Sequence, residues 1–298
     1  MKKILLKIIS VTILLLILTI GCKKDKNVTN VTLDKDNVTL EIGETATLTA
    51  TVHPHDAANK EVLWTSSSTD VATVTNGIVT AKGIGSTTIT VTTEDGNYTA
   101  TCTVKVAPEW VEINGIKWAK RNVDMPGTFA TNPENAGMFY QWGRPVGWSN
   151  SDPLINSKGE TIWDNSPYVP TTESIWTKDN DPCPSGWRVP TISELESLIQ
   201  AASEWTTLNN VHGWVFGTGN NTIFLPAAKG REGENGTLMN EHLWFTVNTF
   251  GMYWSNYSKD QMSWGVMAEY ISFINDRFEL GEFGLYRSYG CSVRCVAE

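Results

Sequence analysis

Four cysteines beyond residue 100 are the side chains with the clearest chemistry, because a thiol can form a disulfide, bind a metal or act as a nucleophile. They are Cys102, Cys183, Cys291 and Cys295. A zinc site would need a further pair of Cys or His at ligand spacing beside Cys291 and Cys295, and the sequence offers none. Because Cys102 lies far from the other three, we expect one disulfide among the C-terminal three. We predict no metal site and no cofactor.

The groups that catalysis needs do not occur in a recognisable pattern. His212 and His242 have no His or Cys at ligand spacing, and the chain has neither a Gly-x-Ser-x-Gly elbow nor a phosphate-binding glycine loop. Glu232 and Glu234 could share acid and base work on a sugar, but alternating charges in a glycine-rich loop are typical of a solvated surface. We therefore predict no catalytic residues.

Tryptophan suggests a binding function, because its flat ring can stack on a sugar. Twelve of the 13 tryptophans lie in residues 110–298. Three of them, Trp148, Trp163 and Trp176, stand among residues such as Ser, Asn, Asp and Thr, which could bond sugar hydroxyls. We predict that these three side chains are exposed on loops and bind carbohydrate.

The first 22 residues have the pattern of an export signal. Three lysines precede the apolar run Ile8–Ile20, whose 13 residues are fewer than the about 20 needed to span a membrane. The run ends in Gly21-Cys22, and this junction resembles the cleavage and lipidation site of bacterial lipoproteins. The resemblance implies that Cys22 carries lipid and anchors the protein in the cell envelope, at the outer membrane. Which side of that membrane it faces is left open, and an uncleaved anchor or an unlipidated signal are the alternatives.

Length and charge limit the partners. Without residues 1–21 the chain would keep 277 residues, enough for two domains after a short tether at residues 22–27. Loss of the three signal lysines from the 23 basic side chains would leave 20 against 32 acidic ones, a formal charge of −12. Because such a surface repels phosphate backbones, we expect no nucleic-acid partner.

Residues 28–107 are rich in Thr and Val, and apolar residues alternate with polar ones as in half-buried strands. Residues 45–52 show this alternation clearly. The segments Val62–Ser67, Val71–Val74, Asn76–Ala81 and Gly85–Ile89 resemble, in this order, a group 2 bacterial Ig-like domain. The resemblance implies an all-β sandwich that serves as a spacer or adhesive module, with Trp64 in the core and Cys102 as a buried free thiol.

Residues 108–298 begin with a hairpin signal and contain a helix signal. Asn114-Gly115 lies between alternating residues and predicts a type I′ turn. Thr191 and Glu194 have the spacing of a capping box, which predicts a helix that continues to about Ala201.

The same region contains motifs that resemble a known family. Residues 181–191 read Asp-Pro-Cys-Pro-Ser-Gly-Trp-Arg-Val-Pro-Thr, and the chain ends in Ser-Val-Arg-Cys at residues 292–295 followed by three residues. Residues 110–298 thereby resemble the major paralogous domain first defined in Fibrobacter succinogenes. Further matching segments are Gly115–Trp118 with Asn122, Tyr140–Arg144, Leu225–Ala228 and Tyr253–Ser255.

This resemblance implies an α+β fold similar to C-type lectins and formylglycine-generating enzymes, in which the two chain ends pair as strands. It also implies a disulfide between Cys183 and Cys295, with Cys291 unpaired. A bridge from Cys183 to Cys291 stays open, because Cys291 lies outside the terminal motif. Four tryptophans of the motifs are expected in the core: Trp118, Trp142, Trp187 and Trp254.

We therefore expect an all-β Ig-like sandwich followed by an α+β C-type-lectin-like domain. The expected function is that of a lipid-anchored envelope protein, in which an Ig-like stalk presents a domain that binds a glycan or an extracellular protein. An enzyme on a formylglycine-generating-enzyme-like scaffold and a structural surface component without a small ligand are the alternatives.

Overall fold

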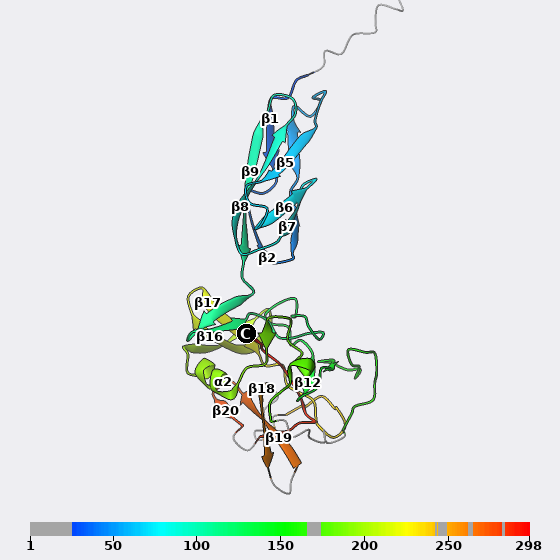
Figure 1. Cartoon of the computed structure of the whole chain (residues 1–298), viewed down its shortest axis with the longest axis vertical. Helices are drawn as coiled ribbons and strands as arrows, with labels where there is room; N and C mark the ends of the chain where they lie inside the picture. The colour runs from blue at the N-terminus through cyan, green and yellow to red at the C-terminus, as the bar shows by residue number, and fades with distance from the viewer. Residues whose placement is uncertain (1–25, 166–173, 242, 244–248, 262–264, 282–283) are drawn as a thin grey trace, which may run out of the picture. The chain divides into compact units, whose positions relative to one another are not determined.

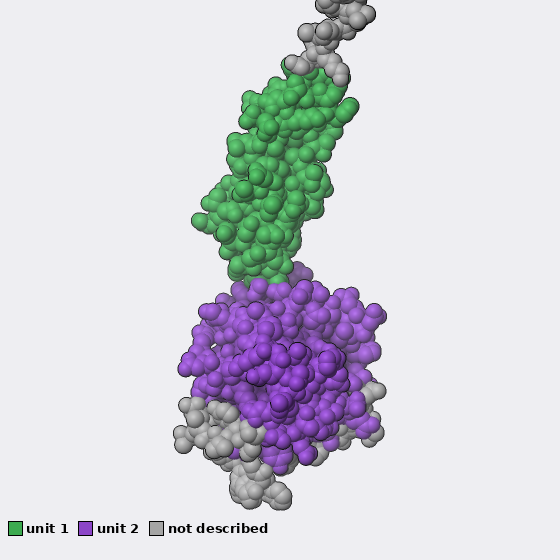
Figure 2. All heavy atoms as spheres, turned by 90° about the vertical axis from the view of Figure 1, so that its right-hand side faces the viewer, with its two compact units in different colours: residues 1–108 green, residues 109–298 purple. Residues whose placement is uncertain are grey.

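The computed structural model describes residues 26–165, 174–241, 243, 249–261, 265–281 and 284–298. The chain divides into two compact units, residues 1–108 and residues 109–298 (Figure 1, Figure 2). This division lies one residue from the predicted boundary. In the described part of the chain, no helix has the length and apolar character needed to cross a membrane. The predicted signal and the lipidation residue Cys22 lie outside the described residues.

Unit 1 is a β-sandwich. A four-stranded sheet in the order β2-β9-β8-β5 packs on a three-stranded sheet in the order β3-β7-β6, and β1 pairs with β4. The strands are β1 (Asn30–Leu33), β2 (Asn37–Glu41), β3 (Thr45–Thr47), β4 (Ala50–His53), β5 (Val62–Ser66), β6 (Ala72–Thr75), β7 (Ile78–Ala81), β8 (Gly85–Thr93) and β9 (Thr99–Ala107).

The alternation in the sequence explains this sandwich. On β8 and β9 the inward residues Ile89, Val91, Cys102 and Val104 are fully buried, and Ile89 lies directly opposite Cys102. Threonines occupy the positions between them, on the other face of the sheet. Cys102 is a buried free thiol, as predicted. The all-β fold expected for this segment is thus confirmed.

The segment 45–52 departs from a simple strand. Its first part, β3, pairs with β7, whereas its second part, β4, pairs with β1. Between them the Leu48 amide donates to the carbonyl of Gly77 at 2.8 Å, and the Leu48 side chain is buried in the core. The chain therefore changes sheets at Leu48 while its apolar side chains continue to face inward.

Unit 2 is also mostly β. Helix α2 (Ile192–Ile199) is the one α-helix among its described residues, beside the 3₁₀ turn η2 (Lys178–Asn180), so the expected α+β balance is not seen. The strands are β10 (Trp110–Ile113), β11 (Ile116–Ala119), β12 (Phe139–Gln141), β13 (Gly147–Trp148), β14 (Trp187–Arg188), β15 (Ser203–Leu208), β16 (Val211–Thr218), β17 (Asn221–Pro226), β18 (Gly251–Gln261), β19 (Gly265–Phe273), β20 (Phe278–Leu280), β21 (Leu285–Tyr286), β22 (Gly290–Cys291) and β23 (Val296–Ala297).

Both local signals in unit 2 are confirmed. Asn114 and Gly115 have φ angles of 52° and 80°, as a type I′ turn between β10 and β11 requires. Thr191 accepts a hydrogen bond from the Glu194 amide and the Glu194 carboxylate accepts one from the Thr191 amide, which completes the capping box of α2. The two ends of the unit meet in one sheet, where β23 pairs with β11 and β14.

The hairpin β18–β19 separates two apolar clusters of unit 2. Trp254 and Tyr270 belong to the first cluster, which contains the disulfide cysteines, and Tyr253 and Ile271 belong to the second. The second cluster also contains Leu195 of α2. The residues of β18 after Trp254 and of β19 before Tyr270 do not belong to the second cluster, and this part of the hairpin carries the candidate site.

Candidate functional site

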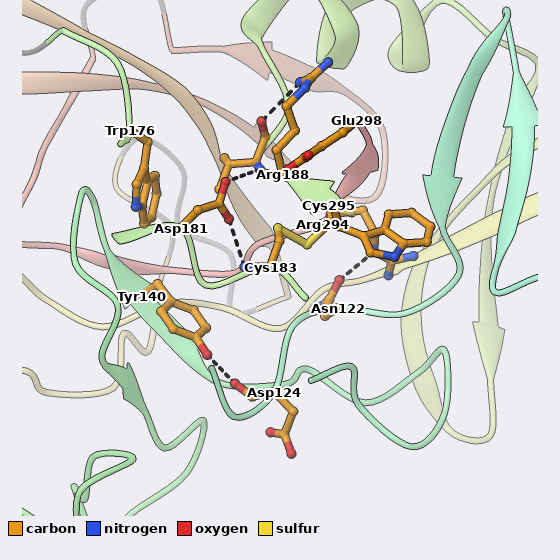
Figure 3. The surroundings of a disulfide bond; sticks show 12 residues. Asn122, Asp124, Tyr140, Trp176, Asp181, Cys183, Arg188, Arg294, Cys295 and Glu298 are labelled. Carbon is orange, nitrogen blue, oxygen red and sulfur yellow. Dashed lines mark hydrogen bonds between the residues drawn. A yellow bond between two sulfur atoms is a disulfide. The ribbon is translucent and has the colours of Figure 1, made fainter. Parts of the chain in front are cut away.

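The motif at residues 181–191, before α2, surrounds a disulfide (Figure 3). Cys183 is bonded to Cys295, the pair that the resemblance implied, and Cys291 is a buried free thiol. The Asp181 carboxylate accepts hydrogen bonds from the Cys183 amide at 2.8 Å and the Val189 amide at 3.0 Å. Burial raises the pKa of Asp181, although these bonds oppose the shift. These contacts hold the loop that leads into α2.

A second set of motif residues forms a buried polar network. The Arg294 guanidinium donates to Asn122 Oδ1 at 2.9 Å, the Ala119 carbonyl at 3.0 Å and the Phe224 carbonyl at 2.8 Å. Asn122 in turn donates to the Tyr253 hydroxyl at 3.1 Å. Burial lowers the pKa of Arg294 to about 10. Since Arg294 is fully buried, these motif residues tie the ends of the unit together and present nothing to a ligand.

The three tryptophans predicted to bind sugar are buried, so their predicted exposure was wrong. Trp148, Trp163 and Trp176 are only 2%, 8% and 4% exposed. Trp163 donates to the Gly233 carbonyl at 3.0 Å and packs on Trp148 with ring centroids 4.8 Å apart. Trp176 donates to the Asn180 carbonyl at 2.8 Å. The polar surroundings mark loops that fold over these rings, and the rings are not available to a ligand.

The most exposed aromatic side chains of unit 2, within its described residues, are instead Tyr257 at 38% and Tyr286 at 40%. Both belong to the sheet around β19. Lys259 on β18 lies opposite Met267 on β19, and Met267 lies opposite Tyr286 on β21. Directly opposed residues of antiparallel strands share a face. Lys259, Met267 and Tyr286 therefore form one row across the sheet.

Two further residues extend this row along the strands. Tyr257 and Glu269 lie two residues from Lys259 and Met267, the spacing of one face of a strand, at the point where the register of β18 and β19 shifts between Trp254 and Ser258. Burial supports this for Tyr257, which is exposed while Ser258 and Ala268 are fully buried on the other face; Glu269 is itself buried. We call the set Tyr257, Lys259, Met267, Glu269 and Tyr286 the tyrosine face. From strand spacing, the Cα atoms of Tyr257 and Tyr286 are roughly 12 Å apart.

An ion pair lies within the tyrosine face. Lys259 Nζ contacts Glu269 Oε1, and Glu269 is only 7% exposed. The other carboxylate oxygen, Oε2, is buried and has no hydrogen-bond partner in the part of the chain that is described. A buried acceptor without a donor costs about 1–3 kcal/mol, so this oxygen lowers the stability of the hairpin.

The sequence does not reveal the tyrosine face, because the exposure of these side chains depends on where the second cluster ends. The available signal was alternation, since Tyr257-Ser258-Lys259 and Met267-Ala268-Glu269 each place a small residue between larger ones. Alternation shows which residues share a face, but not which face lacks a covering element.

Comparison with known proteins defines unit 1. Residues 27–104 match the bacterial Ig-like domain (group 2), which agrees with the resemblance seen in the sequence. An uncharacterised protein of Clostridium acetobutylicum is 46% identical over 80 residues, which are 26% of this chain and 8% of that protein. The Ig-like virion protein of Serratia phage KSP90 is 46% identical over 82 residues, 27% of this chain and 32% of that protein.

An alpha-L-arabinofuranosidase of Bifidobacterium longum is 45% identical over 132 residues, 42% of this chain and 12% of the enzyme. This chain therefore spans between 8% and 32% of the length of these three relatives. Among solved structures, surface layer protein SbsC, domains 1–6, aligns with 66% of this chain and 25% of its own at 15% identity, with a TM-score of 0.25. A TM-score this low carries no argument about the fold.

Proposed function

We propose that this chain is a lipid-anchored protein of the cell surface, in which the Ig-like unit is a spacer and unit 2 binds carbohydrate. The N-terminal sequence supports the anchor, with Cys22 as the lipidated residue. The relatives support the spacer role. An Ig-like virion protein and an arabinofuranosidase each match part of this chain, and the two are named for different roles.

The observation that carries the binding proposal is the tyrosine face. Tyr257 and Tyr286 present aromatic rings on one side of a sheet, where a sugar can stack at low entropic cost because each ring is fixed to a strand. Between them lies Lys259, whose ammonium group pairs with Glu269 and can donate to a sugar hydroxyl. The roughly 12 Å between the two tyrosines suits an oligosaccharide better than a single sugar.

A glycan array tests this proposal. We expect the full-length protein in detergent to bind a subset of oligosaccharides, and the double variant Tyr257→Ala/Tyr286→Ala to lose that binding. A binding hot spot typically contributes about 2 kcal/mol or more. Because both side chains are exposed, the variant should melt as the parent does. Absence of binding by the parent, or full binding by a folded double variant, would contradict the proposal.

The anchor has its own test. Radiolabelled palmitate should enter the protein in cells and should not enter the Cys22→Ser variant, because the variant lacks the thiol that would carry lipid. Two or more acyl chains would give stable anchoring, whereas one is marginal. Unchanged labelling of the variant would show that Cys22 is not the lipidated residue. Digestion of intact cells with protease should remove unit 2 if it faces the exterior.

A further inference from the structure

The sheet of β15, β16 and β17 has two edges, which differ in how their backbone groups are bonded. At the β17 edge, the Phe224 carbonyl accepts a hydrogen bond from the Arg294 guanidinium at 2.8 Å. The Pro226 carbonyl accepts one from the Tyr253 hydroxyl at 3.0 Å. The buried polar network of unit 2 therefore closes this edge.

The hairpin of β15 and β16 shows which backbone groups of β15 face the other edge. Its loop, Asn209-Asn210, has φ angles of 47° and 67°, as a type I′ turn requires. In such a hairpin the residues beside the loop, Leu208 and Val211, exchange backbone hydrogen bonds, and bonded pairs then alternate with unbonded ones along the strands. The Gly217 amide, which donates to the Ala202 carbonyl at 2.8 Å, fits this alternation.

Three residues of β15 therefore direct their amides and carbonyls away from β16: Ser203, Trp205 and Thr207. These groups have no hydrogen-bond partner among the described residues. The strand also lacks the features that protect an exposed edge, because its sequence Ser-Glu-Trp-Thr-Thr-Leu has no Pro or Lys and its register with β16 has no bulge. Ser203 and Thr207 are exposed, so the edge is open to another strand.

We infer that two copies of this chain pair edge to edge through β15, in an antiparallel register centred on Trp205. In this register Trp205 lies opposite its own counterpart, and Ser203 lies opposite Thr207 of the second copy. Every backbone group that faces the open edge then meets a complementary group, and the three opposed pairs form about six hydrogen bonds. The result is a continuous sheet through both copies.

The side chains of β15 favour a second copy in this register. Glu204 lies opposite Thr206 of the second copy, so no like charges face each other and the hydroxyl can donate to the carboxylate. The two neighbouring registers with the same bonding pattern each lose one of the three pairs, and one of them opposes Glu204 to its own counterpart.

Trp205 supplies apolar surface at the centre of this interface. Its ring packs on Trp214 and Phe273, with ring centroids 5.8 Å and 6.4 Å away, but it is only half-buried at the open edge. A strand of the second copy would cover more of the ring, and burial of apolar surface favours association.

Cysteine crosslinking tests the register. Glu204 and Thr206 of the second copy form an unbonded pair, whose Cα atoms would be about 4.5 Å apart, within the range of a disulfide. We expect a mixture of full-length Glu204→Cys and Thr206→Cys proteins in detergent to form a disulfide-linked dimer under oxidising conditions. Either variant alone should form much less, because its two cysteines would be diagonal and about 7–8 Å apart. The parent protein, in which Cys102 and Cys291 are buried, gives the background.

A charge exchange tests the same pairing without a covalent bond. Ser203→Lys/Thr207→Lys places like charges opposite each other, and we expect the dissociation constant of the dimer to rise about tenfold or more in sedimentation velocity. The matched variant Ser203→Glu/Thr207→Lys places opposite charges in the same positions and should restore pairing. Both residues are exposed, so both variants should melt as the parent does.

The outcomes decide between a second copy and other occupants of this edge. If the parent sediments as a monomer at all concentrations and the cysteine mixture does not crosslink, self-pairing is wrong and the open edge is left to an extended segment of another protein. If each cysteine variant alone crosslinks as well as the mixture, or if both charge variants dimerise as the parent does, the register centred on Trp205 is wrong.

Discussion

The two units of this chain are held together by different interactions. Unit 1 depends on strands with long, regular registers, such as the eight opposed pairs of β8 and β9. Unit 2 also has long strands, such as β18 and β19, but seven of its described strands have only two or three residues, and contacts between distant parts of the chain hold these short strands. The clearest is the disulfide, which joins residues 112 positions apart.

The two units therefore depend on their buried side chains in different ways. In a sandwich of alternating strands, each inward side chain contributes a small share of the free energy of unfolding. In unit 2 a few buried groups, among them the Cys183–Cys295 bridge and Arg294, each fix several segments.

The largest expected effect comes from the disulfide. Replacing Cys183 and Cys295 with Ser should lower the free energy of unfolding of unit 2 by about 4–5 kcal/mol, because the bridge closes a loop of more than 100 residues. Unit 1 should keep its stability. Urea denaturation followed by tryptophan fluorescence reports mainly on unit 2, which has 12 of the 13 tryptophans.

The control is Cys291→Ala, which removes a buried thiol and leaves the bridge intact. A loss in the control as large as in the double variant, or equal losses in both units, would show that the bridge is not what distinguishes unit 2.

Arg294→Met should cost about 3–5 kcal/mol in unit 2, because it leaves the buried oxygens of Asn122, Ala119 and Phe224 without their donor. The matched control is Arg277→Met. Arg277 pairs with Asp276 on the surface, where solvent screens the two charges, so its replacement should change stability little. Thermal melts of both variants measure the two losses of stability. A small loss for Arg294→Met would show that the polar network contributes little to the stability of unit 2.

A smaller effect is expected from glycine substitutions at equivalent turns of the two units. Gly77 and Gly115 both follow an asparagine and both have a φ angle of 80°. Alanine at either position should cost about 1–2 kcal/mol from backbone strain. Gly77→Ala should cost about 1–3 kcal/mol more, because its Cβ would lie 2.5 Å from the Leu48 carbonyl oxygen, whereas nothing lies within 4 Å at Gly115. Calorimetry should show this order, and equal losses would contradict it.

The sequence predicted local structure in both units and failed on exposure in the second. Alternation identified the buried residues of β8 and β9, and Asn114-Gly115 and Thr191 marked the turn and the helix start, because each signal is set by residues close in sequence. The burial of Trp163 depends on Gly233 and Gly236, about 70 residues away, and no local pattern reveals that contact.

The lectin-like fold of unit 2 stays a prediction for the same reason. Its motifs are explained by the disulfide and the Arg294 network, which fix the ends of the unit and leave the binding surface unspecified. The tyrosine face lies beyond the second cluster, and its position depends on how α2 packs in that cluster.

One measurement tests most directly the claim that binding resides in unit 2 and the Ig-like unit only supports it. Tyr98 in unit 1 is 39% exposed and Tyr257 in unit 2 is 38% exposed, so the two alanine variants remove equally accessible rings. Titration of an array-selected oligosaccharide should show about a 30-fold loss of affinity for Tyr257→Ala, equivalent to about 2 kcal/mol, and no change for Tyr98→Ala. Equal losses, or a loss confined to Tyr98→Ala, would contradict the account.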